Sequence, residues 1–143
     1  MTSAPKPLPA ITDKSRPYWE AAKAGRLELP RCDNCGTFHT YFEPWCNKCG
    51  HEGVHWEQLS GRGRIWANCR FHRLYFAGFE SDLPYNVAMV ELEEGPRMVT
   101  NIVGLPTGAL EEMPYGMAVE AVFEPVNDEV TLVKFKKSEK GAA

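Results

Sequence analysis

Residues 32–49 read CDNCGTFHTYFEPWCNKC, in which two C-x-x-C pairs are separated by ten residues. Zn²⁺ favours four soft ligands in a tetrahedron, and two residues between paired cysteines let one tight turn direct both sulfur atoms at one point. Gly36 and Gly50 follow the two pairs, where glycine lets backbone N–H groups turn toward the thiolates. The pattern predicts a zinc ribbon. Its predicted ligands are the four paired cysteines, Cys32, Cys35, Cys46 and Cys49.

The predicted zinc is structural, because four cysteine ligands leave no open coordination position for water or substrate. Disulfides and unrelated buried cysteines are the alternatives, but doubled C-x-x-C with a glycine after each pair favours the metal. A redox role is disfavoured because no βαβ pattern surrounds either pair. His39, His51 and His55 lie near enough in sequence to replace a ligand, although four cysteines already complete the site. Function should therefore reside elsewhere in the chain.

Length and charge limit the functional classes. The chain has 143 residues and a formal net charge of −3, so it forms one compact unit or two very small ones. The acidic balance argues against a nucleic-acid protein, whose affinity depends on a basic face. No apolar run approaches the roughly 20 residues of a membrane span, and the N-terminus lacks the apolar core of a signal peptide. We therefore expect a cytoplasmic protein, where thiols stay reduced and available to zinc.

The N-terminal region should contain an arm and a helix. Residues 1–11 hold three prolines and little to bury, so they should form a mobile or surface-draped arm. Thr12, Asp13 or Ser15 can cap a helix over residues 18–24. Tyr18 and Trp19 give this helix an apolar face, which packs either on its own domain or on a partner subunit.

Strand-like patterns fill most of the remaining chain. The expected barrel strands are residues 61–71, 85–92, 97–103, 117–123 and 130–135. Five strands with an irregular connection before the last two resemble an OB-fold barrel. The predicted fold class is mainly β, with an N-terminal helix, a rubredoxin-like zinc ribbon and a five-stranded OB-fold barrel. The expected division is arm and helix 1–26, ribbon 27–58, OB-fold 59–136 and flexible tail 137–143.

The long strand and the segment after it carry the least ordinary side chains. Strict alternation over 64–71 predicts one apolar face, with Cys69 as a small buried hydrophobe, and one face with arginines. The G-x-G at 61–63 indicates a bulge or sharp coil rather than a nucleotide site, because neither a third glycine nor a helix follows. Residues 72–84 are rich in large apolar side chains without a regular period. They either fold back on the barrel or contact another molecule.

A resemblance to a known family rests on ordered motifs: a helix, RLELPRCDNCG, PWCNKCG, WEQLSGRGRIW, PYNVAMVELEEGPRMVTNIVG and YGMAVEAVFE. This order resembles the zinc-ribbon plus OB-fold family of acyl-CoA-associated proteins over roughly residues 12–136. The resemblance implies a small subunit that binds thiolase-fold enzymes, including acetyl-CoA acetyltransferase-like, lipid-transfer-like and steroid side-chain aldolase partners. Other members accompany acyl-CoA hydratases. It also implies that the OB-fold helps form the partner's acyl-CoA site, while the zinc ribbon and the N-terminal helix form the surface that docks on the partner.

The residue inventory agrees with a non-catalytic role, because nothing here assembles the reactive cysteine, histidines and oxyanion site of a thiolase. We therefore expect a zinc-containing subunit of a thiolase-type complex that cleaves carbon–carbon bonds or transfers acyl groups with CoA. The expected assembly is a hetero-oligomer such as α2β2, sharing a CoA thioester with its thiolase-fold catalytic subunit. A subunit of an acyl-CoA aldolase or hydratase is one alternative. A single-stranded nucleic-acid-binding OB-fold protein and a ligand-free scaffold are others.

Five side chains are candidates for contact with acyl-CoA or the partner: Tyr18, Trp19, Arg64, Phe76 and Phe79. The arginines at 62, 64 and 70 could meet CoA phosphates, since the guanidinium fork suits phosphate oxygens, although a solvated strand face is the favoured interpretation. The aromatic residues within 71–85 are compatible with an aryl or polycyclic acyl-CoA. A benzoylsuccinyl-CoA thiolase-type subunit or a steroid side-chain enzyme fits this content, but the sequence does not select the substrate.

Overall fold

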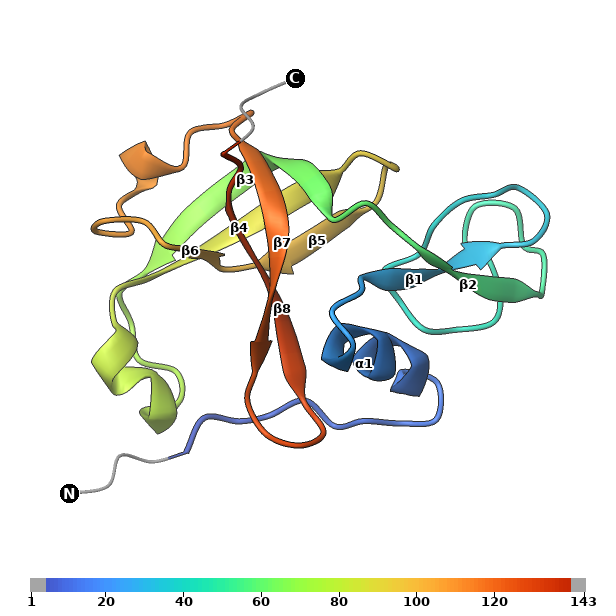
Figure 1. The fold of residues 1–143 in the computed structure, drawn as a ribbon, viewed down its shortest axis with the longest axis horizontal. Coiled ribbons are helices and arrows are strands. Elements are labelled where there is room, and N and C mark those ends of the chain that lie inside the picture. Colours follow the sequence, from blue (N-terminus) through green and yellow to red (C-terminus); the bar gives the residue numbers. More distant parts are fainter. Residues whose placement is uncertain (1–4, 140–143) are drawn as a thin grey trace.

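The computed structural model describes residues 5–139 and confirms the mainly β class, with a helix, a ribbon region and an OB-fold barrel (Figure 1). The helical elements are α1 (Arg16–Lys23), η1 (Ala77–Asp82) and η2 (Leu110–Glu112). The strands are β1 (Glu28–Cys32), β2 (Val54–Gln58), β3 (Arg62–Phe71), β4 (Tyr85–Leu92), β5 (Arg97–Thr100), β6 (Ile102–Val103), β7 (Ala118–Pro125) and β8 (Thr131–Lys137). Within residues 5–139, no helix has the length and apolar character needed to cross a membrane.

Helix α1 lies between the ribbon and the barrel, in contact with β1 on one side and with β7 and β8 on the other (Figure 1). Its small residues Ala21 and Ala22 are buried, which lets the backbone approach these strands closely. Ser15 occupies the N-cap position, but its hydroxyl accepts a hydrogen bond from the Thr12 N–H at 2.9 Å instead of capping the helix. Gly25, at φ +80°, ends the helix as expected.

The ribbon strands β1 and β2 form a two-stranded antiparallel sheet, in which Glu28 pairs with Gln58 and Cys32 with Val54. Because Cys32 ends β1, the sheet delivers the first cysteine directly to the predicted metal site. The segment between the strands forms isolated bridges rather than a regular hairpin: Phe38 pairs with Arg31 of β1, and Trp45 pairs with Glu52.

The barrel sheet has the strand order β5-β4-β3-β7-β8-β6. The expected single strand over 97–103 is wrong, because the chain bends at Asn101 and divides into β5 and β6. Strand β5 pairs antiparallel with β4, whereas β6 pairs parallel with β8. Residues 97–103 therefore supply both edge strands of the sheet, β5 and β6, and close the barrel. The barrel sheet has six strands instead of the expected five.

A β-bulge between Ile65 and Ala67 reverses the expected alternation in β3. Ile65 lies opposite the buried Val90, but after the extra residue it is Asn68 that lies opposite the buried Ala88. Directly opposed residues share a face of the sheet, so Cys69 points outward and is exposed. The prediction of a buried Cys69 is therefore wrong, and the bulge lies between Ile65 and Ala67, C-terminal to the glycines at 61–63 where a bulge or sharp coil was expected.

The same bulge moves Arg70 away from the face that carries Arg62 and Arg64. Arg70 lies opposite the buried Asn86, and its guanidinium donates a hydrogen bond to the Thr107 carbonyl at 3.1 Å. The expected row of three arginines is thus reduced to two. Arg62 donates to Glu93 at 2.9 Å, so its charge is already paired.

The described residues nearest each end of the chain lie against the barrel. Residues 5–11 of the expected arm run along it, and Lys6 forms an ion pair with Asp82 beside η1 (Figure 1). Strand β8 continues through Lys137, so the first residue of the expected tail is part of the sheet. Residues 1–4 and 140–143, which complete the predicted arm and tail, lie outside the described residues.

Candidate zinc centre and docking surface

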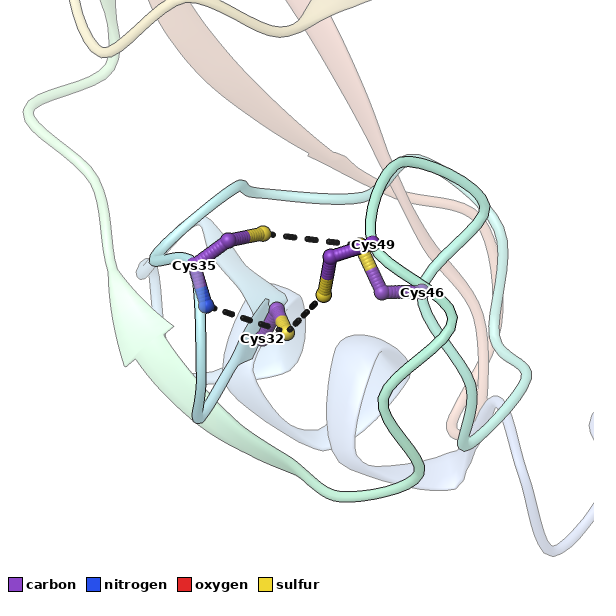
Figure 2. Close-up of side chains that lie close together, drawn as sticks. All are labelled: Cys32, Cys35, Cys46 and Cys49. Carbon is purple, nitrogen blue, oxygen red and sulfur yellow. Dashed lines mark hydrogen bonds between the residues drawn. The ribbon is translucent and has the colours of Figure 1, made fainter.

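The structure brings the four predicted zinc ligands together at one end of the β1–β2 sheet (Figure 2). All four sulfur atoms lie within 4.8 Å of one another, and all four cysteines are free of disulfides. The Cys32–Cys49 and Cys35–Cys46 sulfur pairs are each 3.6 Å apart. A tetrahedron with Zn–S bonds of ~2.3 Å has edges of about 3.8 Å, so the cluster fits one Zn²⁺.

Backbone N–H groups surround the sulfur atoms, as the two glycines predicted. The Asn34 N–H donates to Cys32 Sγ at 3.4 Å, and the Lys48 N–H donates to Cys46 Sγ at 3.3 Å. Gly36 and Gly50 adopt φ +74° and +78°, which completes each turn without a Cβ clash. These donors offset part of the negative charge that four thiolates would place on the site.

Hydrogen bonding also favours the thiolate forms that a metal requires. Contact with the Thr37 hydroxyl, 3.2 Å from the sulfur, is the main cause that lowers the pKa of Cys35 to about 6. The backbone of His51 and the side chain of Asn34 lower the pKa of Cys49. Both cysteines are therefore prepared to bind a cation.

Two side chains near the cluster, Arg31 and His39, make contacts away from the sulfur atoms. The Arg31 guanidinium donates to the Gly36 carbonyl at 2.8 Å and to Glu57 at 2.6 Å, so its charge is shared with a carboxylate. His39 is 2% exposed and stacks on Tyr41, and burial lowers the pKa of its imidazole. Among residues 5–139 the metal-ligating cluster contains the four cysteines and none of the histidines.

An aromatic stack joins α1 to the ribbon. Tyr18 contacts Trp19 and Phe42 at ring-centroid distances of 5.0 and 5.4 Å, and Phe42 contacts Trp56 at 5.6 Å. Burial raises the pKa of the Tyr18 phenol to about 12. The Tyr18 side of the helix therefore packs on its own chain. Trp19 lines a neighbouring groove of about 320 Å³ beside the β7–β8 turn.

The remaining candidate contact residues divide by exposure. Phe76 is 58% exposed and Arg64 is exposed on the outer face of β3. Phe79 instead packs on Tyr85, with ring centroids 5.4 Å apart, and lies under the ammonium group of Lys6. The segment 72–84 thus takes both expected forms, since one part folds back on the barrel while another part faces outward.

A cavity of about 500 Å³ opens at the barrel end between η1 and the loop after β6. Phe79 and Tyr85 line one side, while Asn86 and Asn101 contribute amide groups. Sequence reasoning missed this cavity because its walls come from segments far apart in the chain.

Comparisons with known proteins cover both parts of the chain. Residues 19–54 match the ChsH2 rubredoxin-like zinc ribbon domain, and residues 56–124 match the ChsH2 C-terminal OB-fold domain. A solved structure titled "Ltp2-ChsH2(DUF35) aldolase" is similar with a TM-score of 0.77 and 35% identity, covering 91% of this chain and 98% of that chain. The chain belongs to the ChsH2 (DUF35) family. The zinc ribbon and OB-fold expected from the sequence are therefore confirmed.

Two curated relatives extend the comparison with the ChsH2 (DUF35) family. A "DUF35 domain-containing scaffold protein" of Methanocaldococcus jannaschii is 36% identical over 100 residues, which are 69% of this chain and 68% of that protein. A "Probable enoyl-CoA hydratase alpha subunit" of Thermomonospora curvata is 35% identical over 131 residues. That match covers 92% of this chain but 40% of the relative, so the chain spans about two fifths of its length.

Proposed function

We propose that this ChsH2 (DUF35) protein is a non-catalytic, zinc-containing subunit of a thiolase-type acyl-CoA complex. In this complex it docks on the catalytic subunit and helps shape the acyl-CoA site for carbon–carbon cleavage or acyl transfer. The observation that carries the proposal is the similarity of this chain to a chain of a solved aldolase that is named for two proteins, Ltp2 and ChsH2(DUF35). The similarity covers 98% of that chain. Nearly the whole fold is therefore shared with a protein that is paired with a second protein.

The chemistry of the described residues supports the non-catalytic role. The clustered cysteines form a closed four-ligand site, which suits a structural metal. Cys69 is the remaining cysteine, and within residues 5–139 no histidine is hydrogen-bonded to it as an activated nucleophile would require. Zinc would hold the ribbon together, and α1 would then fix the ribbon against the barrel.

A hydratase partner is the second candidate. It is favoured by the Thermomonospora curvata relative, whose name describes an enoyl-CoA hydratase alpha subunit and which aligns with 92% of this chain. Both candidates place a CoA thioester at the interface. An aryl or polycyclic acyl group is our proposal for the substrate class, because aromatic side chains line the barrel end around Tyr85.

Co-expression distinguishes these partners. The chain would be produced with a candidate thiolase-fold protein and, separately, with a candidate hydratase-type protein from the same organism. Size-exclusion chromatography would then report a stable complex, and a CoA-dependent cleavage assay and an enoyl-CoA hydration assay would report activity. We expect activity only in the complex with the true partner. Full activity of the large subunit alone would contradict the proposal.

A further inference from the structure

Three consecutive apolar side chains project from the loop between β3 and β4. Leu74, Tyr75 and Phe76 are 41%, 60% and 58% exposed. Large apolar residues are commonly exposed one at a time, but three in sequence on one loop form a patch that calls for a partner. We name these three residues the apolar tip.

Stacked aromatic rings hold the base of this loop. Phe71, at the end of β3, stacks on Tyr85 at the start of β4 with ring centroids 5.2 Å apart. Tyr75 contacts Phe71 at 5.9 Å, and Phe79 contacts Tyr85 at 5.4 Å. The rings tie both ends of the loop to the barrel, so the apolar tip stands on a rigid support.

The N-terminal arm clamps the other side of the loop. At Gly78, a Cβ atom would lie only 2.7 Å from the backbone N and Cα of Lys6, so glycine permits the arm to lie directly on η1. Lys6 also pairs with Asp82 and covers the Phe79 ring at 5.3 Å. A surface that is already ordered loses less conformational entropy on binding, which is typical of an anchor residue site.

The shape of the apolar tip excludes an acyl chain as its occupant. Acyl chains bind in concave sites, but the adjacent 500 Å³ cavity is lined by Phe79 and not by the tip residues. A second copy of this chain offers a cavity of about 660 Å³ that Leu105, Met117 and Glu112 line, so self-association is the competing outcome of the test. We infer a pocket on a different protein, because the similar ChsH2(DUF35) chain is paired with a second protein, Ltp2.

We propose that the apolar tip inserts into an apolar pocket with an acidic rim on the catalytic subunit. This inference rests on the proposed function and names the docking element. The acidic rim follows from Arg73, which directly precedes the tip and whose guanidinium lies 5.4 Å from the Tyr75 ring centroid. A cation held beside an aromatic anchor would meet carboxylates around the pocket and steer association.

The test measures binding of purified variants to the catalytic subunit that the co-expression experiment identifies. The triple change Leu74→Ser, Tyr75→Ser, Phe76→Ser should raise Kd by at least about tenfold. Tyr115→Ser is the matched control, because Tyr115 is 73% exposed on another loop and should bind as wild type. Zinc content and thermal melting would verify that both variants are folded.

Two further variants separate the parts of the proposal. Gly78→Ala should displace the arm and raise Kd several-fold although the apolar tip is intact. Arg73→Glu should slow association and weaken its salt dependence, because it removes the steering charge. Unchanged binding by Arg73→Glu at low salt would overturn the proposal that the pocket has an acidic rim.

The outcomes distinguish this inference from the proposed function. If wild type binds the catalytic subunit and the triple variant binds equally well, the assignment of the apolar tip as the docking element is wrong, while the proposed function stands. If wild type binds neither the thiolase-fold nor the hydratase-type subunit, both proposals fail. If wild type self-associates in analytical ultracentrifugation, and the triple change abolishes self-association but not binding to the catalytic subunit, the tip contacts a second copy and the inference is overturned. If the triple change instead abolishes binding to mixed phosphatidylcholine and phosphatidylglycerol vesicles and leaves protein binding unchanged, the tip is a membrane anchor and the inference is overturned.

Discussion

The side-chain amide of Asn86 binds both backbone polar groups of Ile102. Asn86 Nδ2 donates to the Ile102 carbonyl at 2.8 Å, and the Ile102 N–H donates to Asn86 Oδ1 at 2.7 Å. Asn101 Nδ2 returns a hydrogen bond to the Asn86 carbonyl at 2.6 Å. These bonds replace the strand ladder at the bend between β5 and β6, and so they let the sheet close into a barrel.

Asn86→Ala should therefore destabilise the protein strongly. It leaves two buried backbone groups of Ile102 without partners, and each costs about 1–3 kcal/mol, so the free energy of unfolding should fall by about 3 kcal/mol. Asn101→Ala is the matched control, because it removes one hydrogen bond and should cost about 1 kcal/mol. Urea denaturation in the presence of zinc measures both values. Equal effects of the two changes would contradict a special role for Asn86.

Replacing a ribbon cysteine should remove zinc. Wild type should contain about one zinc per chain, and Cys46→Ser should lose most of it because three ligands bind more weakly than four. Cys69→Ser should keep the metal, since Cys69 lies outside the cluster. Elemental analysis of the purified proteins gives the metal content. A protein that stayed folded and free of zinc after exhaustive chelation would refute a structural metal.

The ring of Tyr18 should contribute more to stability than its hydroxyl. Tyr18→Ala removes the contact that joins α1 to Phe42 and should lower the free energy of unfolding by about 3 kcal/mol. Tyr18→Phe keeps the ring and should cost less than about 1 kcal/mol. Because burial raises the pKa of Tyr18 to about 12, wild type should also lose stability between pH 10 and 12, where the unfolded phenol ionises first. Denaturation at alkaline pH would show whether Tyr18→Phe lacks this component.

His55 should give a small pH dependence near neutrality. Hydrogen bonds to Asp33 at 2.6 Å and Glu57 at 3.3 Å raise the pKa of its imidazole. A raised folded pKa stabilises the protein below about 6.5, the ordinary value, and this contribution is lost as pH rises through the folded pKa. NMR titration of the imidazole and a comparison with His55→Gln test the direction. An imidazole pKa below 6.5 would show that the two carboxylates do not hold it.

Arg64 should contribute to acyl-CoA affinity if the outer face of β3 meets CoA phosphates. Arg64→Glu would then weaken acyl-CoA binding by the assembled complex, since repulsion replaces attraction at the phosphate. Arg26→Glu controls for a general change of charge away from β3, although it also breaks the pair with Glu28. Isothermal titration of the complex with acyl-CoA measures the effect. Unchanged affinity in Arg64→Glu would show that this face is simply solvated.

Local chemistry made much of this protein readable from its sequence. The spacing of Cys32, Cys35, Cys46 and Cys49 requires only short turns, so it predicted a cluster that the fold brings together. Strand β4 was predicted with its observed bounds, Tyr85–Leu92, because its alternation is regular. Asn127 also marks its turn directly, since Oδ1 accepts the Val130 N–H at 2.7 Å.

The tertiary structure alone decided what depends on partners distant in the chain. The bulge after Ile65 exposed Cys69 and turned Arg70 inward, because a one-residue shift in pairing with β4 exchanges the faces of β3. The bend at Asn101 depends on the Asn86 side-chain amide, which binds Ile102, 16 residues away in the chain. Likewise, only contacts with Tyr85 and with Lys6 of the arm decided that Phe79 is anchored on the barrel. Sequence patterns report local spacing, whereas these choices follow from register and packing between segments that meet only after folding.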